Sequence, residues 1–73
     1  MHLASNSPKV TLQPLVAPCA TGECPTIFQT DRGTLVLQGY VFDPGDAGAE
    51  VPPNEQMIEV PVALLAEYAR MTS

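Results

Sequence analysis

Basic residues are scarce in this chain of 73 residues, which has three Lys and Arg against eight Asp and Glu and a formal net charge of −5 at pH 7. A surface that binds phosphate groups normally has the opposite balance, so we expect no direct contact with nucleic acid. Long apolar runs are also missing, and none reaches the length of a membrane-spanning helix. Residues 1–9 lack the basic-then-apolar layout of a signal peptide. The sequence therefore predicts a soluble, acidic, cytoplasmic protein with no membrane partner.

Groups that perform catalysis are equally scarce. His2 is the single histidine, and it falls in residues 1–8, which we expect to form a flexible tail. No Ser-His-Asp or Cys-His arrangement can then be built on an ordered base. A Gly-rich phosphate loop, a Walker motif and an HExxH motif are also missing. We expect the protein not to be an enzyme.

The acidic residues do not follow the pattern of a calcium site. Residues 43–56 combine three prolines and two glycines with four carboxylates, but the ligand order of an EF-hand loop is absent. We interpret this segment as an exposed acidic loop.

Asp31 and Arg32 occupy the tip of an expected turn, where Asp31 starts the turn and Arg32 points into water.

The strongest structural pattern is a β-hairpin. Residues 26–30 and 34–42 are rich in β-branched and aromatic side chains and flank the short turn 31–33. This spacing places Gly33 in the left-handed conformation, which only glycine adopts without a Cβ clash. It also pairs Phe28 with Val36, and Ile27 with Leu37. Gly39 inside the second strand predicts a bulge or a close approach by another element.

The rest of the chain predicts a single small domain over residues 9–73. Residues 10–13 alternate as a strand does, and Pro14 confines that strand to an edge of the sheet. Residues 57–60 resume strand character, and 62–71 form a helix with Pro61 in its first turn. The predicted fold is α+β and β-rich, a small antiparallel sheet of three or four strands with one short C-terminal helix; a half-open barrel is the main variant. The predicted core comprises Leu12, Ile27, Phe28, Leu35, Val36, Leu37, Val41, Ile58, Val60, Leu64, Leu65 and Tyr68.

Cys19 and Cys24 have three possible states. A disulfide would close a very small loop and contribute about 2 kcal/mol, but a reducing cytoplasm disfavours it. A structural zinc needs four ligands, which one chain does not supply, although two chains could together offer four thiolates. Two reduced thiols without a cofactor are the simplest interpretation. Disulfide and zinc remain open at these two residues.

Tyr40, Phe42 and Tyr68 are the candidate interaction residues. Core is the commoner use of such side chains in a small domain, but an apolar patch left uncovered is an interface. Our leading hypothesis is a non-enzymatic, homodimeric protein-interaction module. Its expected partners are a second copy of the chain and a basic DNA-binding regulator. Its mechanism is pairing of an exposed strand edge or docking of this patch. The alternative is a thiol-based metal-binding or redox-responsive mini-domain that uses Cys19 and Cys24.

Several short motifs carry a resemblance. Cys24-Pro25-Thr26, Asp31-Arg32-Gly33-Thr34, Gln38-Gly39 and Glu59-Val60-Pro61 occur in order along the chain. In this the sequence resembles a group of small actinobacterial proteins that are often encoded near helix-turn-helix regulators. The resemblance implies an accessory role beside a transcription regulator, and it implies no activity and no functional residues.

Overall fold

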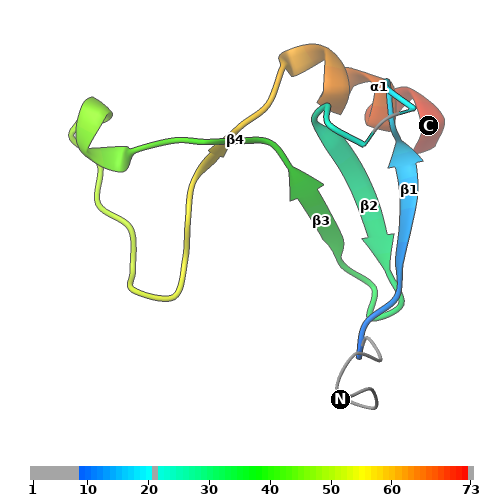
Figure 1. Cartoon of the computed structure of the whole chain (residues 1–73), viewed down its shortest axis with the longest axis horizontal. Helices are drawn as coiled ribbons and strands as arrows, with labels where there is room; N and C mark the ends of the chain where they lie inside the picture. The colour runs from blue at the N-terminus through cyan, green and yellow to red at the C-terminus, as the bar shows by residue number, and fades with distance from the viewer. Residues whose placement is uncertain (1–8, 21, 73) are drawn as a thin grey trace.

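The computed structural model describes residues 9–20 and 22–72 of the chain. In order along the chain, its elements are β1 (Leu12–Val16), β2 (Thr26–Thr30), β3 (Leu35–Gln38), β4 (Tyr40–Val41), the short 3-10 helix η2 (Pro44–Ala47), β5 (Ile58–Glu59) and α1 (Val62–Thr72). Figure 1 shows the main sheet beside the C-terminal helix, with a separate extension on the opposite side. The α+β, β-rich fold class is confirmed. His2 and the predicted tail 1–8 lie outside the described residues.

The predicted hairpin is confirmed as β2 and β3. These strands are antiparallel, and Ile27 pairs with Leu37 and Phe28 with Val36. Gly33 has φ of 77°, the left-handed conformation that the turn requires. The turn is organised by Thr30, whose buried hydroxyl accepts from the backbone N–H groups of Arg32 at 3.0 Å and Thr34 at 3.2 Å.

The main sheet has three strands in the order β1-β2-β3, so β1 and β3 are its edges. The edge position predicted from Pro14 is confirmed, although the strand runs further along the chain than residues 10–13. The register shifts between Pro14 and Val16, and this irregularity lets the strand continue past the proline. Val16 then pairs with Ile27.

Helix α1 packs on one face of this sheet and makes the core. Val16, Ile27 and Leu64 are the buried aliphatic side chains that form the core cluster of the described residues, and Ile27 is completely buried. Ile27 and Leu64 were predicted core residues, whereas Val16 was missed. Leu37, Val60 and Tyr68 are half-buried against this cluster. The opposite face of the sheet carries Phe28 and Val36, and no helix of the described residues lies over it (Figure 1).

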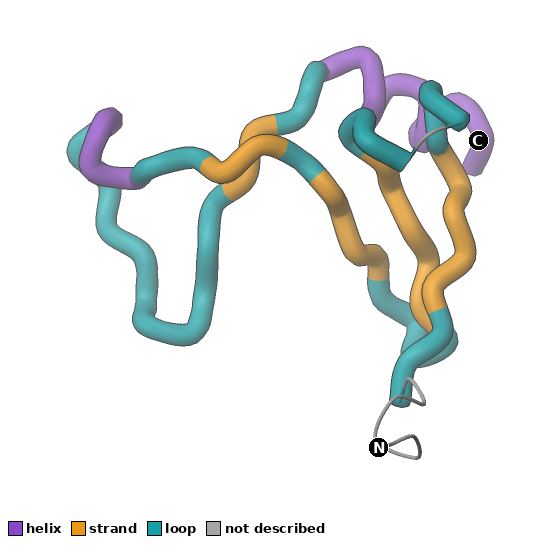
Figure 2. The backbone as a smooth tube through the Cα atoms, in the orientation of Figure 1, coloured by secondary structure: helices purple, strands orange, loops and turns teal. Residues whose placement is uncertain are grey.

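The segment 34–42, predicted as one strand, divides at Gly39. Its second part, β4, leaves the main sheet and pairs with β5, Tyr40 with Glu59 and Val41 with Ile58. The described residues form two separate sheets and no closed barrel. Figure 2 shows that β4, β5 and the loop between them extend away from the main sheet. We call residues 40–59 the arm.

The predicted core residues that are exposed lie in three places: the arm, the edges of the main sheet and the outer side of α1. Val41 and Ile58 belong to the arm, where the two-residue strands β4 and β5 pair only with each other in the described structure, so the strand pattern that suggested burial there was wrong. Leu35, Val36 and Leu12 lie at the two sheet edges, and Leu65 lies on the outer side of the helix. The predicted core residues that are exposed are Leu12, Leu35, Val36, Val41, Ile58 and Leu65.

Candidate interaction surface

The two strands of the arm sort its side chains into two faces. Directly paired residues of antiparallel strands lie on the same face, so Val41 and Ile58 share one face. Tyr40 and Glu59 share the other face. Phe42, two residues after Tyr40, belongs to that second face as well.

One apolar face of the arm runs out from the core. A Cβ at Gly39 would lie 2.6 Å from Val60 Cγ1 and 3.3 Å from Ile58 Cδ1, so these side chains lie on the Gly39 and Val41 face. Val60 packs against the core cluster, Ile58 is 39% exposed and Val41 is 91% exposed. The face therefore becomes progressively more exposed with distance from the core. It ends in an almost fully solvated valine.

The second face carries two of the predicted interaction residues. Tyr40 is 60% exposed and Phe42 is half-buried. The Phe42 N–H donates to the Met57 carbonyl at 3.2 Å, so Met57 lies across from Phe42. A cavity of about 410 Å³ adjoins these residues, lined by Val41, Phe42, Asp43, Pro44, Val51, Glu55, Gln56 and Met57.

Tyr68, the third predicted interaction residue, lies elsewhere. It is on α1 and packs against Val16, Ile27 and Leu64. The structure thus brings Tyr40 and Phe42 together on the arm and places Tyr68 at the core. Sequence reasoning missed Met57 as an interaction residue, and it treated Val41 and Ile58 as core. The available signal was the long loop 43–56, because a two-stranded ladder joined by such a loop buries little on its own.

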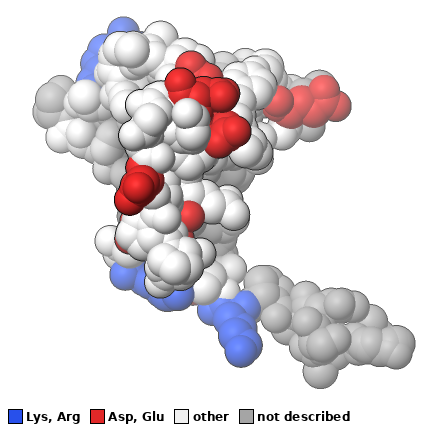
Figure 3. All heavy atoms as spheres, turned by 90° about the vertical axis from the view of Figure 1, so that its left-hand side faces the viewer, with Lys and Arg blue, Asp and Glu red and all other residues white. Residues whose placement is uncertain are grey.

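Negative charge is concentrated on the arm. Residues 40–59 contain no Lys, Arg or His. Figure 3 views the molecule from the arm side, where carboxylates are spread over the surface and the cations lie at its margins. The exposed acidic loop predicted from residues 43–56 is confirmed. The carboxylates of the arm belong to Asp43, Asp46, Glu50, Glu55 and Glu59, and all five residues are exposed.

The acidic loop begins in a defined conformation. The Asp43 side chain caps η2 and accepts from the Gly45 N–H at 2.9 Å. Gly48 ends η2 in the left-handed conformation, with φ of 66°. The next backbone hydrogen bond, from the Ala49 N–H to the Pro44 carbonyl at 2.9 Å, closes the turn. Asp46 lies in the first turn of η2.

Cys19 and Cys24, the other candidate pair, form a disulfide in this structure. The sequence favoured two reduced thiols. The loop between them brings the two Cα atoms to 5.7 Å, which is within the range a disulfide requires. The amide of Gln38 at the end of β3 donates to the carbonyls of Gly22 at 2.8 Å and Cys24 at 3.0 Å, which ties this loop to the sheet. The pairing is compatible with both functional hypotheses.

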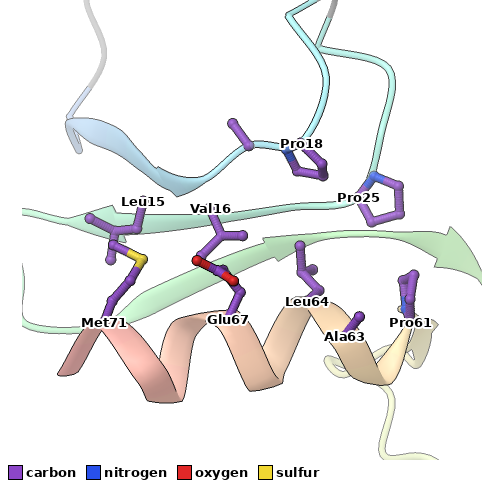
Figure 4. A pocket seen from close by; sticks show the side chains of 10 residues that line it. Leu15, Val16, Pro18, Pro25, Pro61, Ala63, Leu64, Glu67 and Met71 are labelled. Carbon is purple, nitrogen blue, oxygen red and sulfur yellow. The ribbon is translucent and has the colours of Figure 1, made fainter. Parts of the chain in front are cut away.

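A second, larger hollow lies between this loop and the helix. Its volume is about 570 Å³, and Figure 4 shows Pro18 and Pro25 above it and α1 below it. Its only charged lining residue is Glu67. Glu67 accepts a hydrogen bond from Arg70, one turn along the helix, and this contact lowers the pKa of Glu67 and raises the pKa of Arg70. The lining residues are Leu15, Val16, Ala17, Pro18, Pro25, Pro61, Ala63, Leu64, Glu67 and Met71.

Metal ligands do not gather in the described part of the chain. No group of three or more His, Cys, Asp or Glu side chains there is arranged to hold a metal ion. Among the same residues, no helix has the length and apolar character needed to cross a membrane.

Comparison of the chain with protein-family models, with curated proteins and with solved structures found no match.

Proposed function

We propose that this protein is a dimeric, non-enzymatic protein-interaction module whose arm binds a basic protein partner, and that it is an accessory to a transcription regulator. The observation that carries the proposal is the outward apolar face of the arm, with Val41 91% exposed and Ile58 opposite it. Residues 40–59, which carry this face, contain five carboxylates and no Lys, Arg or His. The accessory role comes from the motif resemblance alone.

The energetics of the arm favour a covering partner. Two-stranded ladders are marginally stable by themselves in water, and here each strand has two residues. Burying one exposed valine side chain contributes about 1.5–3 kcal/mol. A partner that covers Val41 and Ile58, which share one face, would therefore stabilise the ladder and gain binding energy from the same contact.

The charge of the arm selects the kind of partner. Carboxylates around an apolar centre attract a cationic surface, which increases the association rate and excludes acidic competitors. This attraction is screened by salt because the carboxylates are exposed. We therefore expect binding to weaken as ionic strength rises.

The test uses the purified chain and the helix-turn-helix regulator encoded nearest to its gene, with titration calorimetry as the measurement. We expect Val41→Ser to weaken binding about tenfold, the equivalent of about 1.4 kcal/mol. Val62→Ser is the matched control, because Val62 is 83% exposed but lies on α1. Equal affinities for the parent and both variants would contradict the proposed surface, and so would equal losses in both variants.

The thiol pair supports a second candidate function. The Cys19–Cys24 disulfide lies at the end of the sheet and beside the hollow along α1, so its reduction would release a loop that lines this hollow. Replacing both residues by Ser separates the two functions. Unchanged partner affinity and oligomeric state in Cys19→Ser/Cys24→Ser would eliminate the redox-responsive role.

The proposed location is the cytoplasm, where disulfides are rare. A cytoplasmic location predicts that both cysteines are free thiols in the cell, whereas a persistent disulfide predicts that neither is. Alkylation of the protein during cell lysis, followed by mass measurement, counts the free thiols. Two alkylated cysteines per chain support the cytoplasmic proposal, and none contradicts it.

A further inference from the structure

Within residues 9–20 and 22–72, no strand lies beside the outer edge of β3. The sheet order is β1-β2-β3, so β3 is hydrogen-bonded on the β2 side only. Leu35 and Val36 are 40% and 39% exposed along this edge. An edge strand with free backbone groups is a template for another strand.

The hairpin geometry determines which backbone groups face outward. The Thr30 N–H donates to the Thr34 carbonyl at 2.9 Å, so the Thr30–Thr34 pair is a hydrogen-bonded one. Hydrogen-bonded and non-hydrogen-bonded pairs alternate along an antiparallel ladder. Val36 and Gln38 therefore bond toward β2, and the N–H and C=O groups of Leu35 and Leu37 point to the free edge.

The two edges of the sheet differ in protection. Because Gln29 does not bond toward β3, the same alternation makes Gln13–Gln29 a bonded pair and turns the nitrogen of Pro14 outward. Pro14 thus blocks the outer edge of β1, and the register shift after it distorts that edge further. β3 has no such protection, since residues 33–42 contain neither proline nor a charged side chain.

We propose that β3 pairs antiparallel with β3 of a second copy of this chain, with the two-fold axis at Val36. In this register Val36 faces Val36 of the second copy, and Leu35 pairs with Leu37 of the second copy on both sides of the axis. All outward groups of Leu35 and Leu37 are then used, in four backbone hydrogen bonds. The two three-stranded sheets become one sheet of six strands.

The side chains and charges of the chain fit this occupant. Leu37 lies on the α1 side of the sheet, half-buried against the core cluster, and Leu35 is two residues away on the same face. Pairing Leu35 with Leu37 therefore extends each core toward the other. The uncharged strip 33–42 is where two chains of net charge −5 approach with little repulsion. In this register, Arg32 of each copy lies near the end of β3 of the other copy, where the acidic arm of that other copy begins.

This pairing names the surface through which the proposed dimer forms, and it rests on the dimeric state in the proposed function. It uses β3 and not the exposed arm residue Val41. Val41→Ser is therefore expected to leave the dimer intact. The dimer is measured without the regulator, so failure of either proposal is distinguishable from failure of the other.

The experiment is native mass spectrometry of the full chain, with Val36→Lys and Val36→Glu measured singly and mixed. We expect the parent to be a dimer. Each single variant should form a dimer at least tenfold weaker, because like charges then face each other. When the two variants are mixed, opposite charges face each other and a mixed dimer should form. Leu12→Lys is the matched control, because Leu12 is 46% exposed on the same sheet face but on β1. We expect Leu12→Lys to remain dimeric.

A monomeric parent overturns the proposal, as does a dimer that survives Val36→Lys or dissociates equally with Leu12→Lys. Leu35→Pro provides a second variant that spares the β2–β3 ladder, since the lost N–H points outward, as Pro14 does on β1. Hydrogen exchange of the parent adds an independent measurement. The amides of Leu35 and Leu37 should become protected as the concentration rises, and fast exchange of both at concentrations where the dimer dominates excludes pairing at this edge.

Discussion

Gly39→Ala tests whether the close approach at the base of the arm holds the two sheets together. An added Cβ would lie 2.6 Å from Val60 Cγ1 and 2.7 Å from the Glu59 backbone carbonyl oxygen. Carbon atoms pack best at about 3.5–4.0 Å, so both neighbours would have to move by roughly 1 Å. Val60 can change its side-chain rotamer. The Glu59 carbonyl belongs to the strand paired with β4, and it can move only if the ladder moves.

The expected cost of Gly39→Ala follows from these two contacts. Overpacking costs about 1–3 kcal/mol, and each ladder hydrogen bond that is lost adds about 1 kcal/mol. We expect the free energy of unfolding to fall by about 2–3 kcal/mol, a large part of the roughly 3–5 kcal/mol that a domain of this size supplies. Urea denaturation followed by circular dichroism measures this change. Hydrogen exchange at Phe42, whose N–H bonds to Met57, reports separately on the arm.

Gly45→Ala is the matched control for Gly39→Ala. A Cβ at Gly45 would have Asp43 Oδ1 as its nearest neighbour, at 3.3 Å, and this atom is the end of an exposed side chain. We expect the stability of Gly45→Ala to stay within about 1 kcal/mol of the parent. If Gly39→Ala is as stable as the control and its arm amides are equally protected, the close approach does not determine how the arm leaves the sheet.

The remaining predictions concern the turn and the disulfide. Thr30→Val removes the buried acceptor for two backbone N–H groups, so we expect a loss of about 1–3 kcal/mol in urea denaturation. A loss no larger than that of the exposed variant Thr11→Val would contradict this role of Thr30. Reduction of the Cys19–Cys24 disulfide should lower the free energy of unfolding by about 2 kcal/mol through loop entropy, which is measured as a lower thermal midpoint with reductant. The control Cys19→Ser/Cys24→Ser should have the same midpoint with and without reductant. A parent whose midpoint does not change with reductant would refute the estimate.

The hairpin and the helix were predictable from the sequence because their signals are local. Gly33 ends a turn between two β-rich runs, and that spacing alone determined the pairing of Phe28 with Val36. Pro14 likewise predicted an edge strand without any knowledge of its neighbours. Such features depend on backbone conformation and on residues a few positions apart.

Burial on the arm was not predictable in this way. Val41 has the same apolar character as Ile27, but Ile27 has a strand on each side and α1 above it, whereas Val41 has one short neighbouring strand. Alternation in the sequence shows which residues share a face and does not show whether anything covers that face. The pairing of Cys19 and Cys24 posed a similar difficulty, because it depends on the path of the loop between them and on redox conditions.

The small core connects the two proposed surfaces. In the described part of the chain the core is built from three buried aliphatic side chains, Val16, Ile27 and Leu64, and a domain of this size has little stability in reserve. Pairing at β3 would add to the sheet that already contains Ile27, so it should raise the stability of the main sheet. Covering Val41 should instead stabilise the arm, which meets that sheet at Gly39. The two associations should therefore protect different amides, those of β2 and β3 on dimerisation and those of Tyr40 and Phe42 on binding the basic partner.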